Sequence, residues 1–116
     1  MIAGLHSALS GMQAGGRLLG ASAHNIANAL TEDFKRTEAI PEVSASGGVS
    51  VRLEQDNRPG PVIFDPENPD EPREGSNVDL AEEIVGSLEA AHLFEANVAS
   101  FEIQNRAIGS VLDILE

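Results

Sequence analysis

Two long stripes of small and aliphatic residues, one at each end of the chain, most constrain how this sequence can fold. Steps of three and four residues alternate along both stripes, which is the spacing of an a/d heptad seam on a helix. The sequence therefore predicts two long terminal helices. The first stripe consists of Ile2, Leu5, Leu9, Met12, Gly16, Leu19, Ala23, Ile26 and Leu30, and the second of Leu80, Ile84, Leu88, Ala91, Phe94, Val98, Phe101, Asn105, Ile108, Leu112 and Leu115.

The N-terminal stripe lacks the charged outer face of an ordinary amphipathic helix. Residues 1–31 hold one charge, Arg17, and five glycines. Each glycine in a helix interior costs about 1 kcal/mol relative to alanine, so the isolated helix is expected to be marginal. The same glycines would let another backbone approach closely, and Gly16 and Gly20 among them form a G-x-x-x-G face. The five are Gly4, Gly11, Gly15, Gly16 and Gly20. A loop marked by the glycines is the alternative, and the uninterrupted seam disfavours it. We expect a helix that neighbours cover on several sides, as in a subunit of an assembly.

The middle of the chain has short apolar runs between turn signals. Val49, Val51 and Leu53 alternate with polar residues, as in a half-buried strand, and a second run covers residues 62–64. We expect these runs to pair as a hairpin around a loop at residues 55–60. Three prolines, Pro66, Pro69 and Pro72, then predict an extended acidic loop.

The start of the second helix is expected at Ser76 or Asn77. Ser76 with Asp79 resembles a capping box, and Asp79, Glu82 and Glu83 suit a helix N-terminus. The predicted fold class is mainly α, with two terminal helices paired as an antiparallel coiled coil and a small β-hairpin and loop insertion between them. One structural unit would then comprise an N-terminal helix (1–31), a hairpin with an acidic proline-rich loop (32–75) and a C-terminal helix (76–116).

Composition excludes several classes of function. The net charge is −12 with only seven Lys and Arg among 116 residues, which disfavours nucleic acids and anionic membrane surfaces as partners. The chain has no cysteine, and therefore neither disulfides nor thiolate chemistry. No cleavable Sec-type signal and no apolar run long enough for a membrane span are recognised.

One polar cluster has the spacing of a metal site. Glu89, His92 and Glu95 lie one turn apart, as in the E-x-x-H motif of di-metal bundles, but such sites need carboxylates from several helices. A solvated polar face is the preferred interpretation. His6 and His24 are isolated. We expect no catalytic residues, no metal, no cofactor and no small-molecule substrate.

Two strings at opposite ends of the chain resemble the motifs of bacterial flagellar axial proteins, the rod, hook and hook-associated subunits. The first is His24-Asn25-Ile26-Ala27-Asn28-Ala29 followed by Phe34-Lys35-Arg36. The second is Gly75-Ser76-Asn77-Val78-Asp79-Leu80-Ala81-Glu82-Glu83, followed by Phe94-Glu95-Ala96-Asn97. Between them, Val62-Ile63-Phe64-Asp65-Pro66 with Pro69-Asp70 resembles the middle of the small proximal rod proteins. The family usually has Thr-Pro-Gly-Tyr-Lys where this chain has Thr31-Glu32-Asp33-Phe34-Lys35, which leaves the shape of that turn open.

The resemblance implies a non-enzymatic rod subunit that polymerises through its terminal helices. It implies as partners further copies, other rod subunits and the flagellar type III export apparatus, and as location the periplasmic rod of the basal body, reached without a cleaved signal. The rival interpretation is a free-standing helical adaptor that forms a closed bundle outside any flagellum. The expected assembly seam is Leu5, Leu9, Met12, Leu19, Ile26, Leu80, Ile84, Leu88, Phe94, Val98, Phe101, Ile108 and Leu112, and the family-motif residues are Asn25, Ile26, Asn28, Asn77, Val78, Asp79, Glu95 and Asn97.

Overall fold

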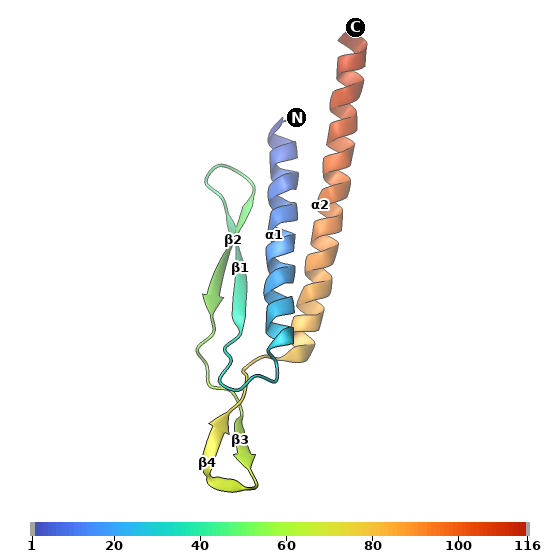
Figure 1. The fold of residues 1–116 in the computed structure, drawn as a ribbon. Coiled ribbons are helices and arrows are strands. Elements are labelled where there is room, and N and C mark those ends of the chain that lie inside the picture. The colour runs from blue at the N-terminus through green and yellow to red at the C-terminus, as the bar shows by residue number, and fades with distance from the viewer. Residues whose placement is uncertain (1, 116) are drawn as a thin grey trace.

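The computed structural model describes residues 2–115. Met1, with which the first expected segment begins, and Glu116, with which the last one ends, lie outside these residues. Two helices run side by side in opposite directions, and two β-hairpins connect them (Figure 1). The molecule is elongated, with extents of 79 × 24 × 14 Å. The elements in order are α1 (Ile2–Ala27), β1 (Thr37–Val43), β2 (Val49–Gln55), β3 (Val62–Asp65), β4 (Asn68–Glu74) and α2 (Leu80–Leu115).

The helices meet through small residues. A Cβ atom added at Gly15 would lie 3.1 Å from both the carbonyl oxygen of Ala90 and the Cβ of Phe94. One at Gly11 would overlap the side chain of Asn97. Because these glycines have no side chain, α1 can approach α2 closely, as happens where small residues line a helix interface. Gly16 and Gly20, predicted to allow such an approach, have nothing within 4 Å of an added Cβ within the described chain.

The first hairpin lies along α1. Its strands pair antiparallel from Thr37 opposite Gln55 to Val43 opposite Val49. Val51 is its buried apolar residue, and the guanidinium of Arg17 on α1 donates to the Val51 carbonyl at 3.3 Å. The turn uses Gly47 and Gly48 at φ of 90° and 81°, a conformation that glycine adopts without strain.

The second hairpin extends beyond the helices at the end opposite the chain termini (Figure 1). Val62 lies opposite Glu74 and Asp65 opposite Asn68, with an irregularity between Ile63 and Asp65. Its side chains are mostly exposed. This hairpin therefore projects from the molecule without a core of its own.

The expected fold class is wrong. The chain is a mixture of two helices and two antiparallel hairpins, with 54% helix and 22% strand, and is not mainly a paired helical coiled coil. The expected pairing of residues 49–53 with residues 62–64 is also wrong, because these runs belong to different hairpins. The acidic loop contains β4, whose prolines are tolerated because a two-stranded ribbon has free edges where no ladder hydrogen bond is lost.

The second helix begins later than expected. α2 starts at Leu80, and the carboxylate of Asp79 accepts hydrogen bonds from the backbone N–H of Ala81 at 2.9 Å and of Glu82 at 3.1 Å. Asp79 is thus the N-cap, a position that favours Asp. The Ser76 hydroxyl instead accepts a hydrogen bond from the Val78 N–H at 3.2 Å, which shapes the turn before the helix.

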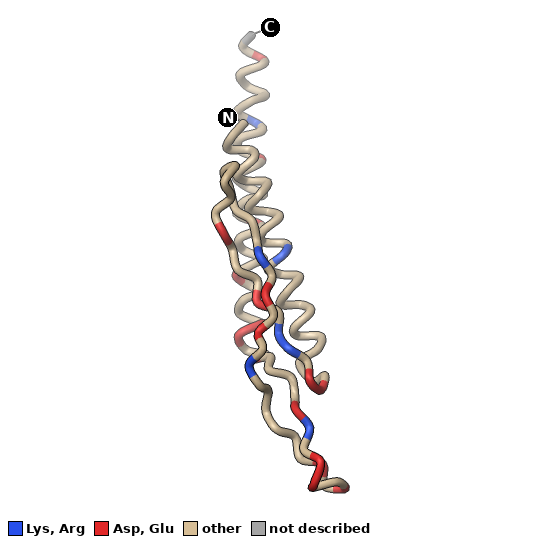
Figure 2. Tube along the Cα trace, turned by 90° about the vertical axis from the view of Figure 1, so that its left-hand side faces the viewer, with Lys and Arg blue, Asp and Glu red and all other residues tan. Residues whose placement is uncertain are grey.

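Charge is distributed unevenly along the molecule. Charged residues mark the hairpins and the end of the helices next to them, whereas the opposite end of the helix pair has few (Figure 2). There α2, with 36 residues against 26 in α1, extends beyond the start of α1 (Figure 1). Neither helix, over the residues described, is long and apolar enough to cross a membrane.

Candidate functional site

A buried asparagine joins the end of α1 to the first strand and to α2. Asn25 is 1% exposed, and its amide nitrogen donates to the carbonyl of Thr37 at 2.8 Å and to Glu83 at 2.9 Å. The backbone N–H of Thr37 donates back to the Asn25 amide oxygen at 2.8 Å. One side chain thus fixes three elements through hydrogen bonds that water cannot easily replace.

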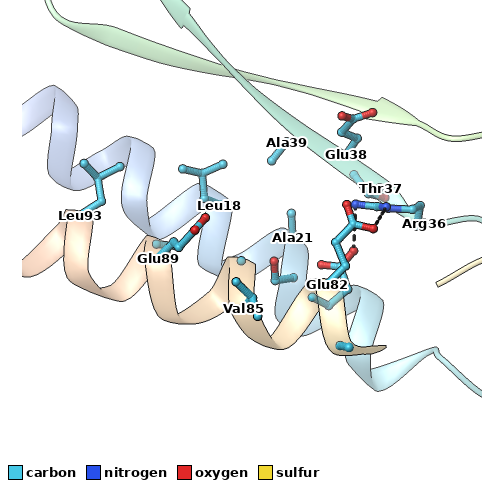
Figure 3. A pocket seen from close by; sticks show the side chains of 15 residues that line it. Leu18, Ala21, Arg36, Thr37, Glu38, Ala39, Glu82, Val85, Glu89 and Leu93 are labelled. Atoms are coloured by element: carbon cyan, nitrogen blue, oxygen red, sulfur yellow. Dashed lines mark hydrogen bonds and ion pairs between the residues drawn. The ribbon is translucent and has the colours of Figure 1, made fainter. Parts of the chain in front are cut away.

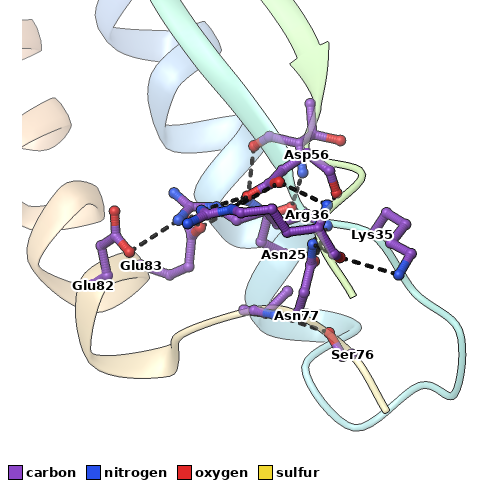
Figure 4. Close-up of polar contacts among 11 residues, drawn as sticks. Asn25, Lys35, Arg36, Asp56, Ser76, Asn77, Glu82 and Glu83 are labelled. Carbon is purple, nitrogen blue, oxygen red and sulfur yellow. Dashed lines mark hydrogen bonds and ion pairs between the residues drawn. The ribbon is translucent and has the colours of Figure 1, made fainter. Parts of the chain in front are cut away.

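Glu83 and Arg36 extend this junction to the first turns of α2 (Figure 4). Glu83 is 4% exposed and lies 3.3 Å from the Arg36 guanidinium, which also donates to Glu82 at 2.9 Å. Partial burial lowers the pKa of Arg36, but the hydrogen bond to Glu82 and the charges of Glu82 and Glu83 outweigh it, so the pKa is raised above its ordinary value. The Nε of Arg36 is buried and has no hydrogen-bond partner among the described residues.

Asn77 lies in the turn before α2 and connects it to two segments, the linker between α1 and β1 and the linker between β2 and β3. Its amide oxygen accepts from the backbone N–H of Arg36 at 2.7 Å, and its nitrogen donates to the carbonyls of Asp56 and Arg58 at 2.8 and 2.9 Å. Asn25 and Asn77 therefore act alike, because the amide of each side chain bonds backbone groups of a distant segment and satisfies them.

Lys35 and Glu74 close the base of the second hairpin. Their side chains form an ion pair, and Glu74 also accepts from the backbone N–H of Gly60 at 2.6 Å. The hydrogen bond from Lys35, followed by that from Gly60, holds the pKa of Glu74 below its ordinary value. Nearby, hydrogen bonds from Arg58 lower the pKa of Asp56 to about 2. We call the group Asn25, Lys35, Arg36, Glu74, Asn77 and Glu83 the polar junction.

Other motif residues have local roles. Asn28 donates to the carbonyl of His24 at 2.9 Å, at the end of α1. Glu95 is exposed and lies 3.7 Å from His92. Asn97 donates to the Leu93 carbonyl of its own helix at 2.8 Å while packing against Gly11. Ile26 and Val78 are half-buried beside the junction.

The expected assembly seam coincides only in part with the face by which the two helices meet, since Phe94 of the seam contacts Gly15. The tightest approaches of α1, at Gly4, Gly11 and Gly15, fall one residue before Leu5, Met12 and Gly16 of the stripe. The aliphatic stripe of α1 consequently lies beside the tightest contacts. Half-buried members are Leu5, Met12, Ile26, Val98, Phe101 and Ile108, and exposed ones are Leu9, Leu19, Leu80, Ile84, Leu88, Phe94 and Leu112.

An open groove of about 690 Å³ runs between α2 and β1, over one side of α1 (Figure 3). Leu18, Val85 and Leu93 point into it, and Glu38, Glu82 and Glu89 lie around it. Within residues 2–115 no group of three His, Cys, Asp or Glu residues could hold a metal ion. The groove thus combines apolar side chains with carboxylates.

Glu83, Arg36, Lys35 and Glu74 were not among the expected site residues. All four lie inside or directly beside the two strings that resemble the family motifs, and this position was the one sign in the sequence that they belong to a site. Their partners lie dozens of residues away, as with Asn25 and Glu83 at a separation of 58 residues. Pattern and spacing do not predict such pairs.

Comparison with known proteins bears on the C-terminal part of the chain. Residues 74–114 match the family described as "Flagellar basal body rod FlgEFG protein C-terminal". The match begins at the last residue of β4 and covers Asn77, Glu83 and nearly all of α2. No curated protein matches the chain.

Proposed function

From the flagellar rod protein family to which residues 74–114 assign this chain, we infer that the protein is a structural subunit of the flagellar basal-body rod and polymerises through its terminal helices. The family gives the coarse role, a structural component of the basal body. The polymerisation, the neighbours and the route of export are the proposed part.

The observation that carries the proposal is the apolar surface left on both helices. Leu9 and Leu19 on α1, and Ile84, Leu88 and Leu112 on α2, are exposed although they follow helical spacing. Apolar side chains exposed at helical spacing along both helices support a protein interaction site. Covering it would need neighbours along most of the molecule's length.

The shape supports an open assembly. The apolar C-terminal turns of α2 extend past α1 at one end of the molecule, and the second hairpin projects at the other (Figure 1). Contacts between unlike ends are heterologous, and they produce a helical filament when the rotation does not close. A rod is such a filament.

The proposal includes the route to the rod. The flagellar type III apparatus would export the chain unfolded and without cleavage, and the chain would assemble with further copies and other rod subunits. The small apolar core supports this part, because a weakly stable subunit is easily kept unfolded for transport.

The test is complementation of a deletion strain with the variants Leu9→Asp and Leu112→Asp. Both side chains are exposed in the single chain, so each variant should fold, as circular dichroism can check. In the rod each carboxylate would be buried without a partner, which costs several kcal/mol. We expect loss of motility and of rods in basal-body preparations.

Glu71→Ala serves as the control, because Glu71 is exposed on the projecting hairpin and should change motility little. Normal rods from both seam variants would refute polymerisation through the helices. A deletion strain with intact rods, together with a small closed oligomer of the purified protein, would favour the adaptor.

A further inference from the structure

We propose that the groove between α2 and β1 binds an amphipathic helix of another protein that carries Lys or Arg beside aliphatic side chains. This deepens the rod role and rests on it only for the biological setting, because the groove itself can be tested on the isolated chain. Three properties of the groove point to such a partner, namely its walls, its charge and its length.

The walls are apolar and come from three elements. Leu18 and Ala21 of α1, Ala39 of β1, and Val85 and Leu93 of α2 face one another across the groove (Figure 3). Val85 is 55% exposed, so its side chain still has most of its surface available to an incoming residue. Aliphatic side chains of a partner would bury this surface.

The rim is acidic. Four glutamates line the groove, Glu38, Glu82, Glu83 and Glu89, against a single base, Arg36. The charge of Arg36 is already shared between Glu82 and Glu83. Glu38 and Glu89 form no ion pair among the described residues, so cations of a partner would find unpaired carboxylates.

A second copy of this chain fits the rim poorly. Arg17 is the one Lys or Arg of α1, and it already donates to the carbonyl of Val51. α2 offers Arg106 alone against several carboxylates of its own. A chain of net charge −12 would therefore bring like charge to the groove, which favours a basic partner of different sequence.

The length suits a helix. Glu82, Val85, Glu89 and Leu93 lie three or four residues apart on one face of α2. At 1.5 Å per residue this face spans about 17 Å, or three turns. A helix packed alongside it would insert side chains at the same spacing.

The experiment measures binding of designed helical peptides to the full chain by fluorescence anisotropy. One peptide carries leucines on one face flanked by lysines, and a second has glutamate in place of each lysine. We expect the lysine peptide to bind, the glutamate peptide to bind at least tenfold more weakly, and added salt to weaken the former.

Matched variants of α2 locate the binding. Val85→Asp should reduce affinity at least tenfold and Glu89→Gln several-fold. Val111→Asp, at a valine 43% exposed outside the groove, and Glu102→Gln, also outside it, should leave affinity unchanged. These pairs change the same residue types on the same helix, so they separate groove binding from general attraction to an acidic chain.

Three results would overturn the proposal. These are absence of binding by the lysine peptide, equal binding of both peptides, and equal loss with Val85→Asp and Val111→Asp. Sedimentation that shows the free chain self-associating, with Val85→Asp dissociating it, would assign the groove to a second copy and equally overturn it. None of these results bears on Leu112→Asp, so failure of the groove leaves the rod role standing.

Discussion

Gly15 and Gly16 are neighbours on α1 and should respond in opposite ways to substitution by alanine. Alanine favours the helix by about 1 kcal/mol at either position. A Cβ at Gly15 would lie 3.1 Å from the carbonyl oxygen of Ala90 and from the backbone nitrogen and Cβ of Phe94, whereas one at Gly16 would meet nothing within 4 Å. Backbone atoms cannot rotate away, so at Gly15 the helices must separate.

The magnitude follows from the difference between the two variants. Overpacking a close contact costs about 1–3 kcal/mol. Because the gain in helix propensity is common to both, Gly16→Ala should be more stable than Gly15→Ala by that amount. We expect Gly16→Ala to raise the free energy of unfolding by about 1 kcal/mol and Gly15→Ala to leave it unchanged or lower it by up to about 2 kcal/mol.

The assay is guanidinium unfolding of the purified chain, followed by far-ultraviolet circular dichroism. Gly20→Ala is a second control, since an added Cβ there also meets nothing within 4 Å, and it should behave like Gly16→Ala. The reasoning is refuted if Gly15→Ala is as stable as Gly16→Ala, because α1 and α2 would then not approach as closely as described.

Three further predictions concern the polar junction and the turn after α1. Asn25→Ala removes three hydrogen bonds and should lower the free energy of unfolding by about 3 kcal/mol, whereas Asn28→Ala, at the end of α1, should cost less than about 1 kcal/mol; urea unfolding of both compares them. Asp33 has φ of 56°, so Asp33→Gly should raise the thermal midpoint, by relief of about 1 kcal/mol of strain, and a lowered midpoint would contradict this. The lowered pKa of Glu74 means that its ion pair with Lys35 stabilises the fold above the unfolded-state pKa and is lost as the pH falls through the folded-state pKa. Glu74→Gln should therefore flatten the acidic side of a stability–pH profile, and an unchanged profile would count against that pair.

The helices were predictable, but the face on which they meet was predictable only in part. Heptad spacing predicted both long helices from sequence, because periodicity is a local property. On α1 the interface uses Gly11 and Gly15, one residue away from the aliphatic stripe, since small residues allow the closer approach. The seam was chosen for its large apolar side chains. Many of these side chains are therefore partly exposed in the single chain.

The hairpins were only partly predictable for a related reason. Val49, Val51 and Leu53 do form a strand, but its partner β1 contains Pro41 opposite Val51, and β4 contains Pro69 and Pro72. Proline argues against a central strand but is allowed at a free edge. A sequence does not say which strands have free edges, so both partner strands were missed.

The turn after α1 shows how a departure from a motif can preserve a conformation. Asp33 stands where the resembled family has glycine, and it adopts the left-handed conformation that glycine would take. Aspartate tolerates that region better than most residues. Its N–H donates to the carbonyl of Glu74 at 2.9 Å, which ties the turn to the end of β4. The altered string therefore did not mean an altered turn.

The small core gives a physical reason why order and assembly would be linked in the proposed rod. The buried apolar residues within the described chain are Ala8, Ala14, Val51 and Ala90, three of them alanines that bury little surface. Ordering each residue costs about 1–2 kcal/mol of conformational entropy, so a core this small leaves two long helices only modestly stable in the single chain. The polar junction holds one end of the molecule through hydrogen bonds, whereas toward the chain termini the described parts of α1 and α2 pack on each other and, at Ser10, on the tip of the first hairpin. Neighbours that cover Leu9, Leu88 and Leu112 would supply the missing burial, so the segment farthest from the junction gains most from assembly.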